Sequence, residues 1–312
     1  MIRLLYLLTF LCLSSTISAQ QIPLFTQYRQ HASIINPAMI NSDYLAYENN
    51  LSIGVSYRSQ WVDIPNNPVT QTLVGDYMDT NGGGVRLLTG GYIINDQTGP
   101  TGFTGAYGKI GGVLSDDPYY GGVSFGLSFG VVQYRVNAED IRLQDPSDSV
   151  PLNNQSKVFP DVGLGAFAYH RLSQGWLEDA VVYGGLSIPQ VMGLNLDFSD
   201  ATGEVSTKRI QHFYAVAGMY KFFDNDSFLE PSAWVKFAPN APISVDFNLR
   251  YQMTSGFWIG TGASLSGNYH LETGFIIAQR LRIGYGFDYS FSNFGSYAGN
   301  THEIHVNFSL PR

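Results

Sequence analysis

The chain has 312 residues, of which 13% are charged and 14% aromatic, and its formal net charge is −8. A soluble domain carries about 25% charged residues, so roughly half of the usual solubilising charge is missing. The 17 lysines and arginines are scattered and form no basic stripe, which argues against nucleic acid as a partner. Beyond the start of the chain, no stretch is apolar over the ~18 residues that a transmembrane helix needs. This composition is typical of a membrane barrel whose strands alternate lipid-facing and lumen-facing residues.

Residues 1–19 have the pattern of a secretory signal peptide. Arg3 supplies a basic start, residues 4–13 form a short apolar run, and Ala19 ends a group of small residues at the expected cleavage site. The apolar run is too short for a transmembrane anchor. Cys12, the only cysteine, lies within this run, and the bulky residues before it do not fit a lipoprotein signal. The mature chain therefore has no cysteine for a disulfide or a thiolate site.

Residues 20–50 form a mixed segment between the signal peptide and the first expected strand. Pro23, Asn36 and Pro37 make it too irregular for a strand, yet its composition is not that of a flexible linker. We expect this segment to plug a barrel lumen or to lie at the periplasmic mouth. The candidate plug or partner-binding residues are Gln27, Tyr28, Asn36, Pro37 and Ala38.

From residue 51 to residue 312, apolar and polar residues alternate with the period of a β-strand. The clearest cases are residues 243–252, 281–291 and 303–310. Successive strand side chains point to opposite faces, so one face of each segment is apolar and the other is polar or glycine. In a secreted sandwich the apolar face would line a core, whereas in a membrane barrel it would contact lipid.

Three observations favour the membrane barrel. The segments have about nine to eleven residues, which is the length that crosses a bilayer when a strand is tilted. The signal peptide directs the chain to the right compartment. Charged residues also occur in the middle of the segments, on the polar face, where water or pairing can hold them. The residues expected to face the lumen are Asp246, Arg250, Arg282, Asp288 and Glu303.

We expect fourteen antiparallel strands, an even number of the kind found in bacterial barrels. Their starts are expected near Leu51, Val69, Gly84, Gly102, Tyr120, Pro160, Ala180, Lys208, Phe228, Ile243, Gly256, Asn268, Arg280 and His302. If the first strand starts in the periplasm, the odd-numbered connections lie outside the cell and should be longer. Residues 59–68, 135–159, 189–207 and 292–301 fit this expectation, and the short stretches at 80–83, 224–227 and around Gln279 fit the periplasmic side.

No motif indicates catalysis, a metal site or a cofactor. His302 and His305 are spaced by three residues on an expected strand, whereas a zincin motif needs a spacing of four on a helix. The glycine-rich runs lack the lysine and the helix of a phosphate loop. The acidic pair Asp116–Asp117 and the acidic residues within 145–148 have no EF-hand spacing, so we interpret them as solvated loops.

Three pairs of stretches resemble one family in particular. They are residues 23–28 with 35–38, residues 57–62 with 68–73, and residues 282–290 with 302–304. In this order they resemble the PorP/SprF family of outer-membrane proteins of the type IX secretion system, and the resemblance extends over essentially the whole mature chain. Met39 and Ile40 depart from the family pattern, which would place an aromatic and a small residue after Ala38.

The resemblance implies a multi-pass outer-membrane barrel without enzymatic activity. It also implies a role in secretion or gliding, through contact with periplasmic ring proteins or through delivery or anchoring of one large surface adhesin. Residues 57–72 would then form the first external loop and its flanking strand ends. Trp61 there would be an interfacial anchor or a cargo contact. The candidate external-loop contacts are Arg58, Gln60, Trp61, Pro68, Thr70 and Gln71.

Two other functions stay open from the residues alone. Fourteen strands with an amino-terminal Asn-Pro-Ala segment also resemble transporters of the FadL type, so the chain is alternatively a diffusion channel or a hydrophobic-solute transporter. A barrel hydrolase would need serine, histidine and an acid to converge at one rim, and a single sequence does not show such convergence.

Overall fold

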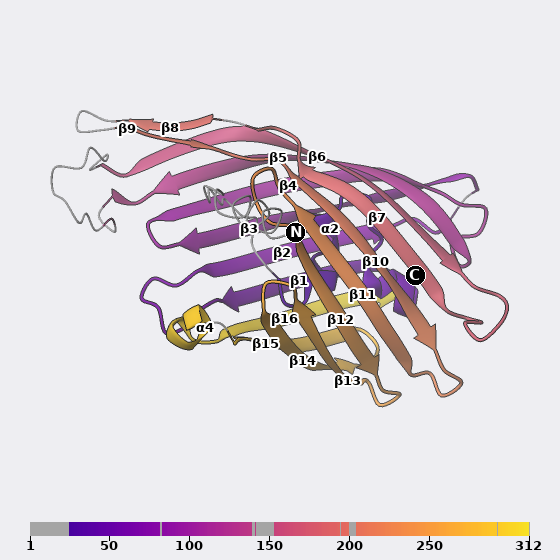
Figure 1. The fold of residues 1–312 in the computed structure, drawn as a ribbon. Coiled ribbons are helices and arrows are strands. Elements are labelled where there is room, and N and C mark those ends of the chain that lie inside the picture. Colours follow the sequence, from indigo (N-terminus) through magenta and orange to yellow (C-terminus); the bar gives the residue numbers. More distant parts are fainter. Residues whose placement is uncertain are drawn as a thin grey trace, which may run out of the picture.

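Fourteen antiparallel strands close into a barrel in the computed structural model, which describes residues 25–81, 83–138, 141, 153–193, 195–199, 204–291 and 293–311 (Figure 1). The predicted signal peptide lies outside these residues. Each barrel strand pairs with its neighbours in the chain, and the last strand closes on the first. The predicted fold class and strand number are therefore confirmed. No helix within the described ranges is long and apolar enough to cross a membrane.

The strand bounds are close to those predicted. The barrel consists of β1 (Asn49–Ser59), β2 (Val69–Met78), β3 (Val85–Thr98), β4 (Thr101–Leu114), β5 (Gly121–Val136), β6 (Gln155–Arg171), β7 (Val181–Gln190), β10 (His212–Phe222), β11 (Phe228–Phe237), β12 (Ser244–Gln252), β13 (Phe257–Ser264), β14 (Asn268–Ile277), β15 (Leu281–Ser290) and β16 (Thr301–Pro311).

Two predicted starts are wrong by more than two residues. Strand β6 starts at Gln155 rather than at Pro160, because it continues to pair with the long β5 up to Val136. Strand β10 starts at His212 rather than at Lys208, because β8 (Asn195–Ser199) and β9 (Glu204–Lys208) form a separate hairpin before it. The sequence pattern did not indicate this hairpin.

The two faces of the barrel wall differ as a membrane barrel requires. On β1, Ser52, Ser56 and Arg58 are buried in the lumen, whereas Ile53 and Val55 are about half exposed on the outside. The same alternation recurs around the ring, where the outward side chains include Leu73, Ile93, Phe125, Phe129, Leu249, Ile259, Phe275 and Ile304. An apolar exterior, with the charged side chains of the wall turned into the lumen, is the arrangement that a bilayer stabilises.

The two ends of the barrel differ in their connections. The β1–β2, β5–β6, β7–β10 and β15–β16 connections are long and lie at one end, where Figure 1 shows α4 (Asn293–Ala298) and the β8–β9 hairpin. The other end carries the start of β1, the end of β16 and mostly short turns, such as residues 253–256. Bacterial barrels have short periplasmic turns and longer extracellular loops. We therefore call the first end external and the second periplasmic.

Residues 25–47, called the lumenal segment below, lie inside the ring of strands. They form η1 (Tyr28–His31), α2 (Ala32–Ile35) and α3 (Ser42–Tyr47). Asn41 caps α3, because its side chain accepts a hydrogen bond from the Tyr44 amide at 3.0 Å. Glu48 then adopts a left-handed conformation with φ 59°, and the chain reverses into β1.

Candidate functional site

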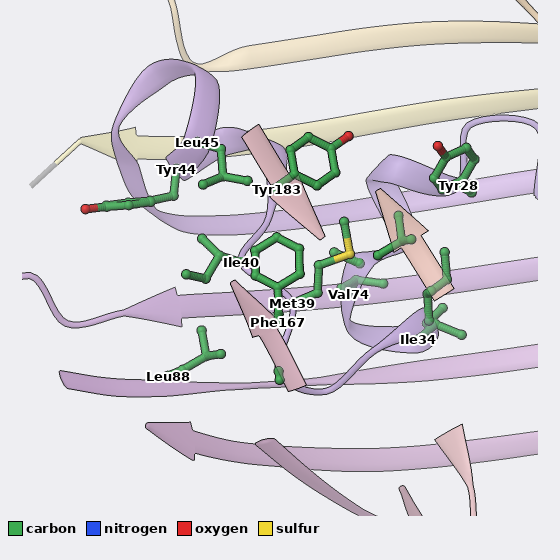
Figure 2. Packing of buried hydrophobic residues seen from close by; sticks show 14 of the residues in the cluster. Tyr28, Ile34, Met39, Ile40, Tyr44, Leu45, Val74, Leu88, Phe167 and Tyr183 are labelled. Carbon is green, nitrogen blue, oxygen red and sulfur yellow. The ribbon is translucent and has the colours of Figure 1, made fainter. Parts of the chain in front are cut away.

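The lumenal segment is packed against the barrel wall through an apolar core. Figure 2 shows side chains from the segment and from four wall strands in contact inside the barrel. The segment contributes Tyr28, Ile34, Met39, Ile40, Tyr44 and Leu45, and the wall contributes Val74, Leu88, Phe167 and Tyr183. Ile40 is only 1% exposed, so this part of the lumen is as dry as the interior of a soluble protein.

A buried charge cluster fixes the middle of the segment. Arg29 on η1 lies 3.4 Å from Glu230 on β11 and also bonds Glu272 on β14. Glu230 in turn lies 2.8 Å from Arg250 on β12. All four side chains are at most 2% exposed, so the two arginines and two glutamates are paired away from the surface.

A second cluster centres on Glu303 of β16. Its carboxylate accepts hydrogen bonds from the backbone amides of Thr26 and Gln27, at 2.8 Å and 3.1 Å. Arg58 of β1 approaches the same carboxylate at 3.3 Å and bonds Asp288 of β15 at 2.7 Å. The start of the segment is therefore bound to the wall near the external end.

A third cluster centres on Asp43 of α3, near the periplasmic end. Its carboxylate lies 2.5 Å from Arg282 of β15. It also accepts hydrogen bonds from Ser52 of β1 at 2.7 Å and from Asn307 of β16 at 2.8 Å. This carboxylate thus joins the segment to three neighbouring strands.

The Asn36-Pro37-Ala38 stretch lies against the wall at β6 and β7. The Asn36 amide donates hydrogen bonds to the carbonyls of Ala166 and Leu186, at 3.1 Å and 3.3 Å. The Asn36 side-chain oxygen accepts from the Ala38 amide at 2.9 Å. One asparagine side chain therefore hydrogen-bonds both the barrel wall and the backbone of the turn that follows it.

Glycines on the wall make this close approach possible. A Cβ atom on Gly165 would lie 1.9 Å from the Asn36 side-chain oxygen, and one on Gly126 would lie 2.4 Å from the Pro37 carbonyl oxygen. These positions accept no larger residue unless the segment moves. Gln27 and Tyr28 are also buried in the lumen. The Tyr28 hydroxyl donates a hydrogen bond to the Ser232 hydroxyl of β11 at 2.7 Å.

The candidate external-loop contacts between residues 58 and 71 lie in three places: the lumen, the β1–β2 connection and the outer face of β2. The side chains of Arg58 and Thr70 lie in the lumen, and Thr70 donates to Asp96 at 2.5 Å. Gln60, Trp61 and Pro68 belong to the β1–β2 connection, and Gln71 of β2 points outward and is exposed.

The five charged residues expected to face the lumen are all on the inner face of the wall. Arg250, Arg282, Asp288 and Glu303 take part in the clusters described above, and Asp246 lies 2.5 Å from Lys236. Sequence reasoning missed Arg29, Asp43, Glu230 and Glu272. Glu230 and Glu272 each stand as a single charge on the polar face of an expected strand, and this pattern could have placed them in the lumen.

A cavity of about 710 Å³ lies at the external end, and Phe25, Thr26 and Tyr28 of the lumenal segment line it. Towards the periplasm, a cavity beside Asp43 and Asn307 holds only about 10 Å³. That space is about what one water molecule needs. The lumenal segment therefore fills the section of the lumen between these two cavities.

Among the residues that the structure describes, no group of three or more histidine, cysteine, aspartate or glutamate side chains is arranged to hold a metal ion. His302 and His305 also lie on opposite faces of β16. His305 is buried in the lumen, whereas His302 contacts the outward-facing Tyr285 through a 2.6 Å hydrogen bond.

A protein-family model described as "Type IX secretion system membrane protein PorP/SprF" matches residues 17–308. The match covers nearly the whole chain and confirms the resemblance seen in the sequence. No curated protein matches the chain.

Solved outer-membrane barrels share the fold. The CymD monoaromatic hydrocarbon channel is similar with a TM-score of 0.53 and 10% identity, over 89% of this chain and 95% of that chain. The Pseudomonas putida toluene transporter TodX is similar with a TM-score of 0.52 and 8% identity, over 95% of this chain and 100% of that chain. At such low identities the likeness shows the fold alone.

Proposed function

Because this chain belongs to the PorP/SprF family of type IX secretion system membrane proteins, we propose that it is a closed, non-enzymatic component of that system. In this proposal residues 20–50 act as a plug. The barrel supports secretion or surface anchoring of an adhesin from the outer membrane, and it contacts periplasmic ring proteins. It does not itself conduct the exported chain.

The filled lumen is the observation that carries this proposal. An exported helix needs a passage about 10–12 Å wide, whereas the buried segment occupies that space with Tyr28, Ile35 and Ala38, each at most 1% exposed. The segment is also bound by three buried charge clusters, each of which is costly to break. These features support a scaffold or anchor more than a conduit.

The first test is the surface and secreted proteome of a clean deletion, compared with its parent and a complemented strain. Loss of one large surface protein would identify a dedicated adhesin partner, and loss of many exported proteins would identify a core part of the secretion machinery. An unchanged proteome would refute the secretion role.

Contact with ring proteins has a separate test. Trp176, in the periplasmic turn between β6 and β7, is 85% exposed. A photo-crosslinking residue at this position should capture a periplasmic protein in living cells, and the same residue at Trp61 on the external side is the matched control. If position 176 captures no periplasmic protein, the ring contact at this turn is wrong.

The second candidate is a channel for hydrophobic solutes. It is favoured by the barrel likeness to the CymD and TodX structures, whose printed names describe a hydrocarbon channel and a toluene transporter. Purified protein in liposomes would then take up a small aromatic solute faster than empty liposomes. The closed-component proposal predicts equal rates, and also no stepwise ion conductance in a planar bilayer.

A further inference from the structure

The β1–β16 pair, called the seam below, differs from every other strand pair of the barrel. The other pairs in the ring are joined by a connection of the chain itself, whereas β1 and β16 are the first and last strands. Their pairing extends from Asn49 opposite Pro311 to Ser59 opposite His302, with a register shift between Asn49 and Leu51. Only ladder hydrogen bonds and side-chain contacts hold the seam, so it is the place where the ring opens with the least loss of connectivity.

The lumenal segment bonds both seam strands near the external end. Arg58 of β1 lies directly opposite Glu303 of β16. Glu303 accepts hydrogen bonds from the Thr26 and Gln27 amides, and the Thr26 hydroxyl bonds both Arg58 and, at 2.7 Å, Asp288. Thr26 therefore contacts the two sides of the seam at once.

The segment bonds both seam strands again near the periplasmic end. One oxygen of the Asp43 carboxylate accepts from Ser52 of β1 and from Asn307 of β16. Ser52 and Asn307 also contact one another at 3.0 Å. Asn307 leans across the seam over Gly54, where a Cβ atom would lie 2.8 Å from its side-chain oxygen.

The two contact points lie far apart along the seam. Ser52 and Arg58 are six residues apart on β1, which corresponds to about 20 Å at the rise of a strand. Asn36 also spans two neighbouring strands, β6 and β7, but it does so through a neutral amide, and those strands are joined by their own turn. The segment thus contacts both strands of the one ring pair that lacks a connection at two places, through neutral groups of Thr26 at the external end and through the Asp43 carboxylate at the periplasmic end.

We propose that the lumenal segment is a clasp that holds the first and last strands together, so that the barrel cannot open between β1 and β16 while the segment is seated. The proposal rests on the contacts of residues 26–43 and is independent of the role in secretion. The clasp acts through Thr26 and Asp43, and the two act on the same seam from opposite ends.

Hydrogen exchange in the full-length protein, folded in detergent or lipid, tests this proposal. Asp43→Asn removes the charge that joins Ser52, Asn307 and Arg282, and should raise the exchange of the β1 and β16 amides about tenfold or more while β12 and β13 stay protected. Asp161→Asn is the matched control, because Asp161 is equally buried and paired with Arg209 at 2.8 Å but lies away from the seam. Faster exchange spread evenly over all strands would overturn the proposal, as would the same seam effect in the control.

A covalent lock gives an independent readout. The mature chain has no cysteine of its own, and Val55 lies opposite Val306 across the seam, while Leu73 lies opposite Ile93 across β2 and β3. A disulfide in Val55→Cys/Val306→Cys should restore most of the unfolding temperature that Asp43→Ala loses, and one in Leu73→Cys/Ile93→Cys should restore little. If Asp43→Ala folds only with the seam disulfide, the clasp is supported. Equal recovery by both locks, or failure to fold with either, would overturn it.

Discussion

The lumen and the outer surface of this barrel are built from the same strands but differ in the residues that they carry. Inside, several charged side chains are paired with an opposite charge, as Arg29 and Arg250 are with Glu230. Outside, the mid-strand positions are apolar, as Phe125 and Ile259 are. Buried charges such as Arg29 and Arg250 are therefore stabilised by their shared partner Glu230, because neither face offers bulk water at mid-height.

The largest expected effect comes from breaking a pair inside. Glu230→Gln leaves Arg29 and Arg250 with too little buried negative charge, and should lower the free energy of unfolding by about 3–5 kcal/mol. Denaturant unfolding in lipid or detergent measures this. Asp224→Asn in an exposed periplasmic turn is the control and should have no measurable effect. A loss for Glu230→Gln as small as that of the control would show that the lumen is wet.

A charge placed on the outside should cost slightly less. Ile259→Arg puts an unpaired cation on the lipid-facing side of β13, and the expected loss is about 2–4 kcal/mol near the bilayer midplane. The matched change Ile243→Arg lies in the external β11–β12 connection, beyond the strands, and should cost much less. Equal losses at both positions would contradict the placement of the bilayer around the strand centres.

Glycines on the two faces of the wall should respond differently to an added methyl group. Gly165→Ala faces Asn36 in the lumen, and overpacking there should cost about 1–3 kcal/mol. Gly108→Ala is the control, because a Cβ atom there meets nothing within 4 Å. The unfolding temperatures of the two variants should differ by several degrees. Equal unfolding temperatures would mean that the lumenal segment moves aside without loss of stability.

The smallest expected effect is at the cap of α3. Asn41→Ala removes the acceptor for the Tyr44 amide and should cost about 1 kcal/mol. Asn41→Asp retains an acceptor and should restore most of the loss. Denaturant midpoints compare the two variants, and an equal loss in both would show that the cap contributes little at this half-buried position.

Much of the wall could be predicted because lipid on one side and the lumen on the other make apolar and polar residues alternate along each strand. Segments such as residues 281–290 show that period without interruption, and β15 spans the same residues. Arg58 was expected to be a contact of the first external loop, yet the alternation of Ser52, Ser56 and Arg58 continues the lumen face of β1 to its end. The same signal could have placed Arg58 in the lumen.

The seating of the lumenal segment could not be predicted from sequence. Arg29 finds its partners at Glu230 and Glu272, more than 200 residues away, and no local pattern encodes which strand a lumenal charge will meet. The periodicity that identifies a strand is also absent from residues 25–47, because this segment is buried on all sides.

The path of the lumenal segment has a consequence for assembly. The segment contacts the external cavity at Phe25 and reaches the periplasmic end at Tyr47, and only then does β1 begin. Its contact with Glu303 joins residues 277 positions apart in the chain. Such a contact forms late, because almost the whole chain must be in place before the closure entropy is offset. Residues 25–47 therefore reach their final position only after the last strands have formed. Until then Arg29 and Asp43 lack the wall partners that neutralise them.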